Sequence, residues 1–248
     1  MIKPADGSIE DVPYLSTEQM IEVDRAMIED YQIGLVQMME SAGRNLAHLA
    51  RKRFLGGFPP GKRVVILAGS GGNGGGAMVC ARRLTNWGAI VDVRLARKQE
   101  DYGGVPAQQL RILERMDIAI STAGSPAFLA NSSDIDLVVD GVIGYSLSGP
   151  PRGPAAEMIR WANDQRAPTL ALDTPSGLDA ATGEVFVPAV KAAATLTLAL
   201  PKQGLRLKSE QVGELYLADI SVPPDLYERY LGIKVGILFA ESEIVRLP

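Results

Sequence analysis

The segment VVILAGSGGNGGG (residues 64–76), continued by AMVCARRL (77–84), decides which fold this chain is expected to adopt. An apolar, β-branched run stops at six glycines within eight positions, and a helix-compatible stretch begins directly afterwards. Glycine lacks a Cβ and tolerates positive φ, so its backbone can approach a ligand closely and direct N–H groups at it. Between a strand and a helix N-terminus, such donors form an anion site. The segment therefore predicts phosphate binding; the alternative is that its glycines serve only a tight strand-to-helix turn.

The composition indicates a globular protein of the cytoplasm. The 248 residues are 46% hydrophobic and 22% charged, which is ordinary for one α/β domain spanning residues 1–248. The net charge of −4 argues against nucleic-acid and membrane surfaces as partners, because both are polyanionic. The only cysteine, Cys80, has no partner for a disulfide or a structural metal site, and no stretch resembles a signal peptide or a membrane span. We therefore expect a cytoplasmic protein that binds neither nucleic acid nor membranes.

From residue 63 onwards, strand and helix patterns alternate along the chain. Short apolar runs predict strands at 64–68, 90–95, 118–121, 137–140, 169–172, 195–200 and 214–218. Helical patterns occur at 76–87, 106–115, 126–131 and 154–163. Continuous apolar strands joined by helices are typical of a parallel sheet covered on both faces. We therefore predict an α/β fold with a doubly wound, mostly parallel sheet flanked by helices, a Rossmann-like three-layer sandwich.

Two additional helices are predicted ahead of this repeat. Ser16 and Gln19 form a capping-box pattern, and apolar residues follow at helical spacing as far as Tyr31. A second helix with one apolar face is predicted over 35–54. The domain is thus expected to have an arm at 1–15, a core at 16–223 and a tail at 224–248.

Polar residues stand at the ends of four predicted strands. After the first of these strands, the polar residue lies within the glycine-rich segment. Asn73 lies among the glycines, Asp140 ends one strand, Asp173 and Ser176 follow the next, and Lys202 follows a later one. In a doubly wound sheet these positions share one ligand-binding edge, although a single strand-end Asp is as often only a loop cap. Asp173 is the better candidate for proton transfer, because partial burial makes a carboxyl group hold its proton more tightly. Asn73, Asp140 and Ser176 are candidate oxygen ligands for a small cation.

Other nucleotide-binding and hydrolytic classes fit less well. A dinucleotide dehydrogenase would place an acidic residue after the second strand, where Arg97 and Lys98 stand instead, a pair that would suit a 2′-phosphate. The chain lacks the Gly-Lys-Ser/Thr of a P-loop and the Gly-x-Ser-x-Gly of a serine hydrolase. His48 and Cys80 fall near apolar helix faces, so we expect a packing or surface role for His48 and a packing role for Cys80. The basic residues interpreted as solvated faces are Arg82, Arg83, Arg94, Arg97 and Lys98.

Several motifs resemble one known family. The segment YQIGLVQMMESAGR (31–44) is similar to the N-terminal signature of the NAD(P)HX epimerases, a family with a YjeF N-terminal-type domain. Further motifs of that family are matched in order by a glycine-rich loop (69–77), an Asp-x-x-x-Gly loop (140–149), an Asp-x-Pro-Ser-Gly-x-Asp segment (173–179), Pro-Lys (201–202) and residues 219–223. The resemblance covers about residues 16–223 and implies the same fold as the strand pattern.

This resemblance implies an enzyme that interconverts the R and S epimers of hydrated NADH and NADPH. A hydroxyl group leaves and water adds on the opposite face, for which a carboxylic acid that donates and then accepts a proton suffices. Asp173 matches the family's position near the ring, and Lys202 is the second catalytic candidate. Asn73, Asp140 and Ser176 match the family's ligands for one K⁺ per subunit, and family members are commonly homodimers. The implied dinucleotide contacts are Gly72, Asn73, Gly74, Gly75, Gly76, Gly144, Tyr145, Ser146, Leu147, Ser148, Gly149, Pro150 and Asp173.

The glycine-rich loop departs from the family pattern at two positions. Gly72 and Gly76 stand where the family has an Asn and an Asp, and Ser148 stands where it tends to have a Lys. The backbone donors remain, but polar contacts worth about 1–3 kcal/mol each when buried are lost. The alternative interpretation is therefore a catalytically silent nucleotide-binding or scaffold module of the same fold.

Overall fold

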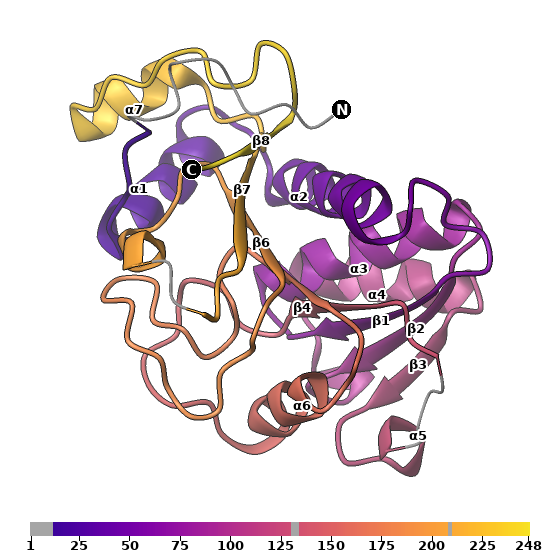
Figure 1. The fold of residues 1–248 in the computed structure, drawn as a ribbon. Coiled ribbons are helices and arrows are strands. Elements are labelled where there is room, and N and C mark those ends of the chain that lie inside the picture. Colours follow the sequence, from indigo (N-terminus) through magenta and orange to yellow (C-terminus); the bar gives the residue numbers. More distant parts are fainter. Residues whose placement is uncertain (1–11, 130–133, 208–209) are drawn as a thin grey trace.

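The computed structural model of this chain describes residues 12–129, 134–207 and 210–248. They form an eight-stranded sheet with the order β3-β2-β1-β4-β5-β6-β7-β8 (Figure 1), in which only β8 is antiparallel to its neighbour. The strands are β1 (Arg63–Ala68), β2 (Ile90–Leu95), β3 (Ala119–Thr122), β4 (Leu137–Gly141), β5 (Thr169–Leu172), β6 (Ala194–Leu198), β7 (Glu214–Ala218) and β8 (Ile244–Arg246). The predicted mostly parallel, doubly wound sheet is confirmed.

Helices cover both faces of the sheet and make the three layers of the sandwich (Figure 1). One face is covered by α2, α3 and α4, the other by α5 and α6, while α1 and α7 pack together near β7. The helices are α1 (Thr17–Glu29), α2 (Leu35–Leu49, continued by a π-helical turn Ala50–Phe54), α3 (Gly72–Asn86), α4 (Gly104–Arg115), α5 (Pro126–Leu129), α6 (Gly153–Asn163) and α7 (Pro224–Leu231). Within the described ranges, no helix is both long and apolar enough to cross a membrane.

The central strand β1 explains why the strands are continuous apolar runs in the sequence. Val64, Ile66 and Ala68 belong to the core beneath α2, α3 and α4, whereas Val65 and Leu67 belong to the core beneath α5 and α6. Side chains alternate between the two faces of a strand, and both faces are covered here, so every one of these residues is buried. The seven predicted strands are all present, with ends shifted by no more than two residues.

The register of the sheet brings the ends of four strands to one edge. β1 lies between β2 and β4, so the crossovers on its two sides run in opposite directions and leave a crevice at the carboxyl ends. Leu67 pairs with Asp140, and Asp140 pairs with Ala171. In the next pair of strands, Leu172 lies opposite Leu196. The residues that follow β1, β4, β5 and β6 therefore face the same crevice.

The structure differs from the sequence predictions at both ends and in the glycine-rich segment. α3 begins at Gly72 instead of residue 76, so most of these glycines are helical. The predicted tail contains α7 and β8, which pack onto the β7 edge. Of the predicted arm, residues 1–11 lie outside the described residues, and Leu15 is fully buried. Of the helix predicted at 126–131, residues 130 and 131 lie outside the described residues.

Arg94 is not the solvated residue that the sequence predicted. It is fully buried in β2, where it pairs with Asp92 at 3.1 Å and donates to the carbonyl oxygen of Phe128 at 2.7 Å. Its guanidinium carbon lies 4.0 Å from the centre of a Trp161 ring. A planar, weakly hydrated guanidinium tolerates burial when its donors are satisfied and an aromatic ring stacks on it. The other basic residues of that prediction are exposed (Arg97 and Lys98) or partly buried in ion pairs with Glu40 (Arg82 and Arg83).

Candidate active site

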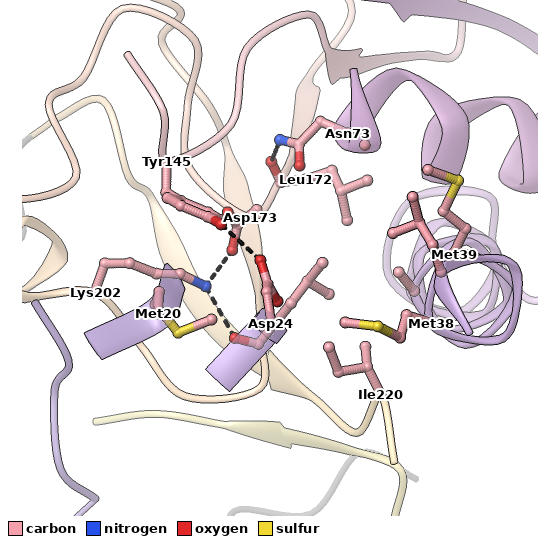
Figure 2. Close-up of a pocket in the computed structure, with 14 residues that line it drawn as sticks. Met20, Asp24, Met38, Met39, Asn73, Tyr145, Leu172, Asp173, Lys202 and Ile220 are labelled. Carbon is pink, nitrogen blue, oxygen red and sulfur yellow. Dashed lines mark hydrogen bonds and ion pairs between the residues drawn. The ribbon is translucent and has the colours of Figure 1, made fainter. Parts of the chain in front are cut away.

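A cavity of about 110 Å³ opens at the crevice formed by the strand ends; we call it the main cavity (Figure 2). For comparison, a closed protein cavity of roughly 150 Å³ admits benzene, so this smaller but open space is of the order of one ring. Its apolar lining consists of Met20, Leu35, Met38, Met39, Ala42, Leu172, Leu198 and Ile220. Its polar lining consists of Asp24, Asn73, Tyr145, Asp173 and Lys202, together with Gly72. In Figure 2 the labelled Met38, Met39 and Ile220 lie on one side and Tyr145, Asp173 and Lys202 on the other.

Asp173 and Lys202 form a buried ion pair in this cavity. The exposed fraction of their side chains is 3% and 1%, and the Lys202 ammonium group donates to the Asp173 carboxylate. The remaining two ammonium hydrogens have Leu198 O at 2.9 Å and Thr197 Oγ1 at 3.4 Å as acceptors. Leu15 holds the following turn, because its N–H donates to Pro201 O at 2.8 Å. The structure thus brings the two predicted catalytic residues together.

The backbone of Asp173 occupies the left-handed region, with φ at 67°. Its N–H donates to Leu196 O at 2.7 Å, which continues the β5–β6 pairing by one residue beyond β5. A non-glycine residue in this region costs of order 1 kcal/mol or more and is kept where the surroundings fix it. Aspartate tolerates this conformation better than most residues, because its short side chain bonds locally. The sharp turn after β5 therefore favours Asp or Asn at this position.

Asp24 on α1 is a polar residue of the cavity that the sequence analysis missed. Its carboxylate accepts a hydrogen bond of 2.6 Å from the Tyr145 hydroxyl, which belongs to the loop after β4. Burial raises the pKa of Asp24 above its ordinary value, although the bond from Tyr145 and the charge of Lys202 oppose that rise. A signal was present: Asp24 follows Met20 by four residues and precedes Met27 by three, so it interrupts the predicted apolar face of the helix.

Asp140 and Ser176 join the loops that follow β4 and β5. The fully buried Asp140 carboxylate accepts from Ser176 N at 2.8 Å, Ser176 Oγ at 2.7 Å and Val142 N at 3.1 Å. Burial raises the pKa of Asp140, and these hydrogen bonds counteract the rise. All three donors are neutral, and within the described part of the chain no Lys or Arg forms an ion pair with this carboxylate. A buried carboxylate without a cationic partner leaves room in the charge balance for a bound cation.

Asn73 stands next to this pair of loops. Its Nδ2 donates to Leu172 O at 2.8 Å, and its amide oxygen faces Gly144, where an added Cβ would lie 2.8 Å from it. The amide oxygen, the Asp140 carboxylate and the Ser176 hydroxyl are the kind of donors that hard cations prefer. The three predicted metal-ligating residues therefore fit a cation by their donor chemistry.

The five predicted contacts in the glycine-rich segment fall into two groups. Gly72 and Asn73 line the main cavity. Gly74, Gly75 and Gly76 are buried inside α3, where they pack against other residues. An added Cβ on Gly74 would lie 1.7 Å from Gly69 O, and one on Gly76 would lie 2.9 Å from Leu172 Cδ2. Close packing thus accounts for these buried glycines without a ligand.

The predicted dinucleotide loop at 144–150 lies between two openings. Tyr145 lines the main cavity. Ser146 to Pro150 instead line a separate hollow of about 440 Å³, which also has Ile143 and the exposed Arg152 in its wall; we call it the loop hollow.

His48 and Cys80 lie in neither opening: His48 stacks on Trp87 with ring centres 5.1 Å apart, and Cys80 is fully buried. Burial raises the pKa of the Cys80 thiol, which keeps it protonated.

Comparison with known proteins points to one family. Residues 35–204 match the family described as YjeF-related protein N-terminus. A NAD(P)H-hydrate epimerase of Dehalogenimonas lykanthroporepellens is 42% identical over 215 residues, which cover 87% of this chain and 84% of that protein. A NAD(P)H-hydrate epimerase of Rhodopirellula baltica is 32% identical over 232 residues, which cover 93% and 91% of the two chains.

A longer relative and a solved structure extend the comparison. A bifunctional NAD(P)H-hydrate repair enzyme Nnr of Salinibacter ruber is 34% identical over 231 residues, which cover 88% of this chain and 42% of that protein. The crystal structure of yeast ynu0 (YNL200c) matches with a TM-score of 0.79 at 25% identity, covering 95% of this chain and all of that one. The family match spans more than half of the chain and includes Asn73, Asp140, Asp173 and Lys202. The chain therefore belongs to the family of YjeF-related N-terminal domains, in which it stands close to the NAD(P)H-hydrate epimerases.

Proposed function

We propose that this chain interconverts the R and S epimers of hydrated NADH and NADPH, with Asp173 as its acid/base group and Lys202 as the cation that holds Asp173 in place. The observation that carries the proposal is a buried Asp173–Lys202 pair in a ring-sized cavity that also has an apolar side. The relatives support the same reaction, since two that cover most of the chain are named NAD(P)H-hydrate epimerases.

The reaction asks little of the protein beyond proton transfer and positioning. The hydrated ring has a hydroxyl group on a carbon next to its nitrogen. The C–O bond breaks while the nitrogen lone pair forms a cationic C=N bond, and water then adds to the other face. The leaving hydroxyl takes up one proton and the incoming water releases one, so the protons balance. Asp173 serves this exchange as acid and base, and Lys202 holds its carboxylate at the cavity.

The apolar side of the main cavity positions the ring and excludes water. Met38, Met39 and Leu172 offer the flat and adaptable surface that a partly saturated ring needs. The rest of the dinucleotide then extends over Gly72 and Asn73 at the start of α3 and along the loop at 144–150. Support for this path comes from the exposed backbone of Gly72 and from the loop hollow beside that loop. The helix N-terminus adds a favourable field for phosphate.

We also propose that Asn73, Asp140 and Ser176 hold one K⁺ per subunit. The buried Asp140 carboxylate, which has only neutral hydrogen-bond donors, supports a monovalent cation. When bound, the ion supplies positive charge beneath the dinucleotide loop. Asp140 and Ser176 tie the loops after β4 and β5 to that position. The measurement is a thermal unfolding series in KCl and in tetramethylammonium chloride of equal ionic strength: equal midpoints contradict this site.

A homodimer is the proposed assembly. The large apolar side chains of Ile21 and Ile28 on α1 and of Leu35 and Val36 at the start of α2 are 37–56% exposed. Ile21 and Ile28 are seven residues apart and share one helix face. A second copy of this chain would cover these apolar side chains. Light scattering measures the mass of the particle in solution, and a monomer at high concentration contradicts the proposal.

The activity is tested by mixing the protein with R-NADPHX and following the S form by chromatography. The wild-type protein should accelerate the conversion, and Asp173→Asn should slow it by about 10²–10⁴-fold, the range for a lost acid/base group. Asp164→Asn, at the exposed C-cap of α6, is the matched control and should leave the rate unchanged.

A wild-type rate equal to the uncatalysed rate would instead support the silent nucleotide-binding or scaffold module. In that case, the unfolding temperature measured with and without NADP⁺ distinguishes a nucleotide-binding module from a scaffold, because a ligand of the native state raises it. A nucleotide-binding module shows this rise, and a scaffold without a nucleotide site does not.

A further inference from the structure

We propose that Asp24 is a second proton-transfer residue of the main cavity, which protonates the departing hydroxyl group of the substrate. The proposal rests on the epimerase reaction proposed above and narrows the part of Asp173 to the attacking water. Three observations carry it: the place of Asp24 in the cavity, its neutral partner Tyr145, and the charge balance around Lys202.

The first observation is geometric. Asp24 lines the same cavity as Asp173 and Lys202, but it arrives there from α1, on a different part of the chain (Figure 2). Its carboxylate oxygen Oδ2 accepts the Tyr145 hydroxyl at 2.6 Å. Across the described residues, Asp24 forms no ion pair within 4.0 Å. The carboxyl group thus faces the reacting space with only a neutral phenol as its direct partner.

The second observation concerns the partner. Burial raises the pKa of Tyr145, and its bond to Asp24 raises it further, so the phenol stays neutral and remains a donor. A phenol that donates one hydrogen bond orients a carboxylic acid without taking its proton. Tyr145 also belongs to the loop proposed to contact the dinucleotide. Substrate binding on that loop is therefore linked to the orientation of Asp24.

The third observation is the charge balance. The cavity lining holds two carboxyl groups, Asp24 and Asp173, and one cation, Lys202. All three ammonium hydrogens of Lys202 have acceptors, namely Asp173, Leu198 O and Thr197 Oγ1. Lys202 therefore neutralises the charge of Asp173 by direct contact, whereas its charge acts on Asp24 only from a distance. Two neighbouring carboxyl groups that share one cation differ in their tendency to keep a proton, and the unpaired one keeps it.

The surroundings of Asp24 agree with this assignment. Burial raises the pKa of Asp24; the hydrogen bond from Tyr145 and the charge of Lys202 lower it, while the charge of Asp173 raises it. On α7, the charges of Asp219 and Asp24 also act on Tyr227, and together with burial they raise the pKa of that phenol. The neutral Tyr227 thus adds no positive charge that would favour the ionised form of Asp24.

The proposed step balances atoms and charge. The Asp24 carboxyl group transfers its proton to the substrate hydroxyl, the C–O bond breaks, and water departs. The ring becomes a cation through its nitrogen, and Asp24 becomes a carboxylate that stabilises this cation. Water then adds to the other face of the ring and releases a proton, which reaches the Asp173 carboxylate through solvent. Exchange with solvent returns that proton to Asp24, so nothing is consumed.

The test compares epimerisation rates of the wild type with those of Asp24→Asn and Asp24→Glu. Asp24→Asn still accepts the Tyr145 hydrogen bond but has no acidic proton, so kcat should fall about 10²-fold or more with little change in KM. Asp24→Glu keeps the acid and should retain more activity than Asp24→Asn. Glu29→Gln, on the exposed side of the same helix, is the control and should behave as the wild type.

The pH profile provides a readout that does not need Asp24→Asn to fold. If Asp24 must be protonated, kcat of the wild type falls as pH rises through the pKa of Asp24. Tyr145→Phe removes a hydrogen bond that lowers this pKa, so the falling limb should move to higher pH, whatever the change in KM. A limb that stays in place in Tyr145→Phe, or wild-type kcat in Asp24→Asn, overturns the proposal.

The failure of the two proposals can be told apart. If the wild-type protein does not accelerate epimerisation at all, the proposed function is wrong, and the role of Asp24 falls with it. If the wild type is active and Asp173→Asn is impaired while Asp24→Asn is not, only the role of Asp24 is wrong.

Discussion

Replacing Lys202 by methionine removes the buried cation of the candidate active site and keeps a side chain of similar length. Lys202 is 1% exposed, and its partner Asp173 is 3% exposed. The variant therefore leaves an unpaired carboxylate out of contact with water. Losing one partner of a buried pair costs about 3–5 kcal/mol, because the remaining charge stays desolvated. With a urea slope of roughly 2 kcal/mol per molar, a loss of about 4 kcal/mol lowers the unfolding midpoint by about 2 M.

The assay is a double-mutant cycle followed by urea unfolding. Asp173→Asn is the second single variant, because asparagine tolerates the φ of 67° at this position whereas an apolar residue would be strained. The double variant Asp173→Asn, Lys202→Met buries no charge and should lose about 2–3 kcal/mol less than the sum of the single variants. If the two losses add to within about 0.5 kcal/mol, the pair is not coupled and the reasoning is refuted.

Two further predictions concern packing. Gly76→Asp should lower the free energy of unfolding by about 3 kcal/mol or more, because its Cβ would lie 2.9 Å from Leu172 Cδ2 and its charge would be buried. Gly72→Asn, whose Cβ meets no atom within 4 Å, should change it by less than about 1 kcal/mol; equal urea midpoints for the two variants contradict this. Arg94→Met should cost about 2–4 kcal/mol, because Asp92 and Phe128 O lose their donor, while the epimerisation rate stays that of the wild type. A variant that unfolds at the wild-type urea concentration would contradict this, because it would show that the bonds of Arg94 to Asp92 and Phe128 O add nothing to stability.

The sheet could be predicted from the sequence because its strands carry a strong signal. Both faces of β1 are covered, so Val64 to Ala68 form an unbroken apolar run. β8 has only three residues, and α7 begins at Pro224 after another proline, so neither produces a comparable pattern. The start of α3 was misplaced for another reason. Glycine disfavours helices, but at Gly74 the backbone of Gly69 leaves no room for a Cβ, and at Gly76 a Cβ would displace the end of the Leu172 side chain.

The candidate active site could be predicted only where its residues follow strands. Asp140 and Asp173 stand directly at strand ends, and the topology of a doubly wound sheet tells where these meet. Asp24 is on a helix that precedes the sheet, and its contact with Tyr145 spans 121 positions of the chain. Periodicity assigns such a residue to a face of a helix but does not tell what the face meets. The burial of Arg94 could not be predicted for the same reason, because its partners Phe128 and Trp161 are also distant in sequence.

The two N-terminal helices are part of the candidate active site and not an addition beside it. α1 contributes Asp24 and Met20 to the main cavity, and α2 contributes Met38 and Met39. Leu15, just before α1, pairs with the backbone on both sides of Lys202, donating to Pro201 O and accepting from Gln203 N at 2.9 Å. The parallel sheet alone would present Asp173 and Lys202 on an open edge, where water would screen their interaction. The helices cover that edge, leave the Lys202 and Asp173 side chains only 1% and 3% exposed, and supply a second carboxyl group. A glycine segment between a strand and a helix is common to many folds, whereas this covered edge with two carboxyl groups and one lysine is the feature on which the proposed proton transfer rests.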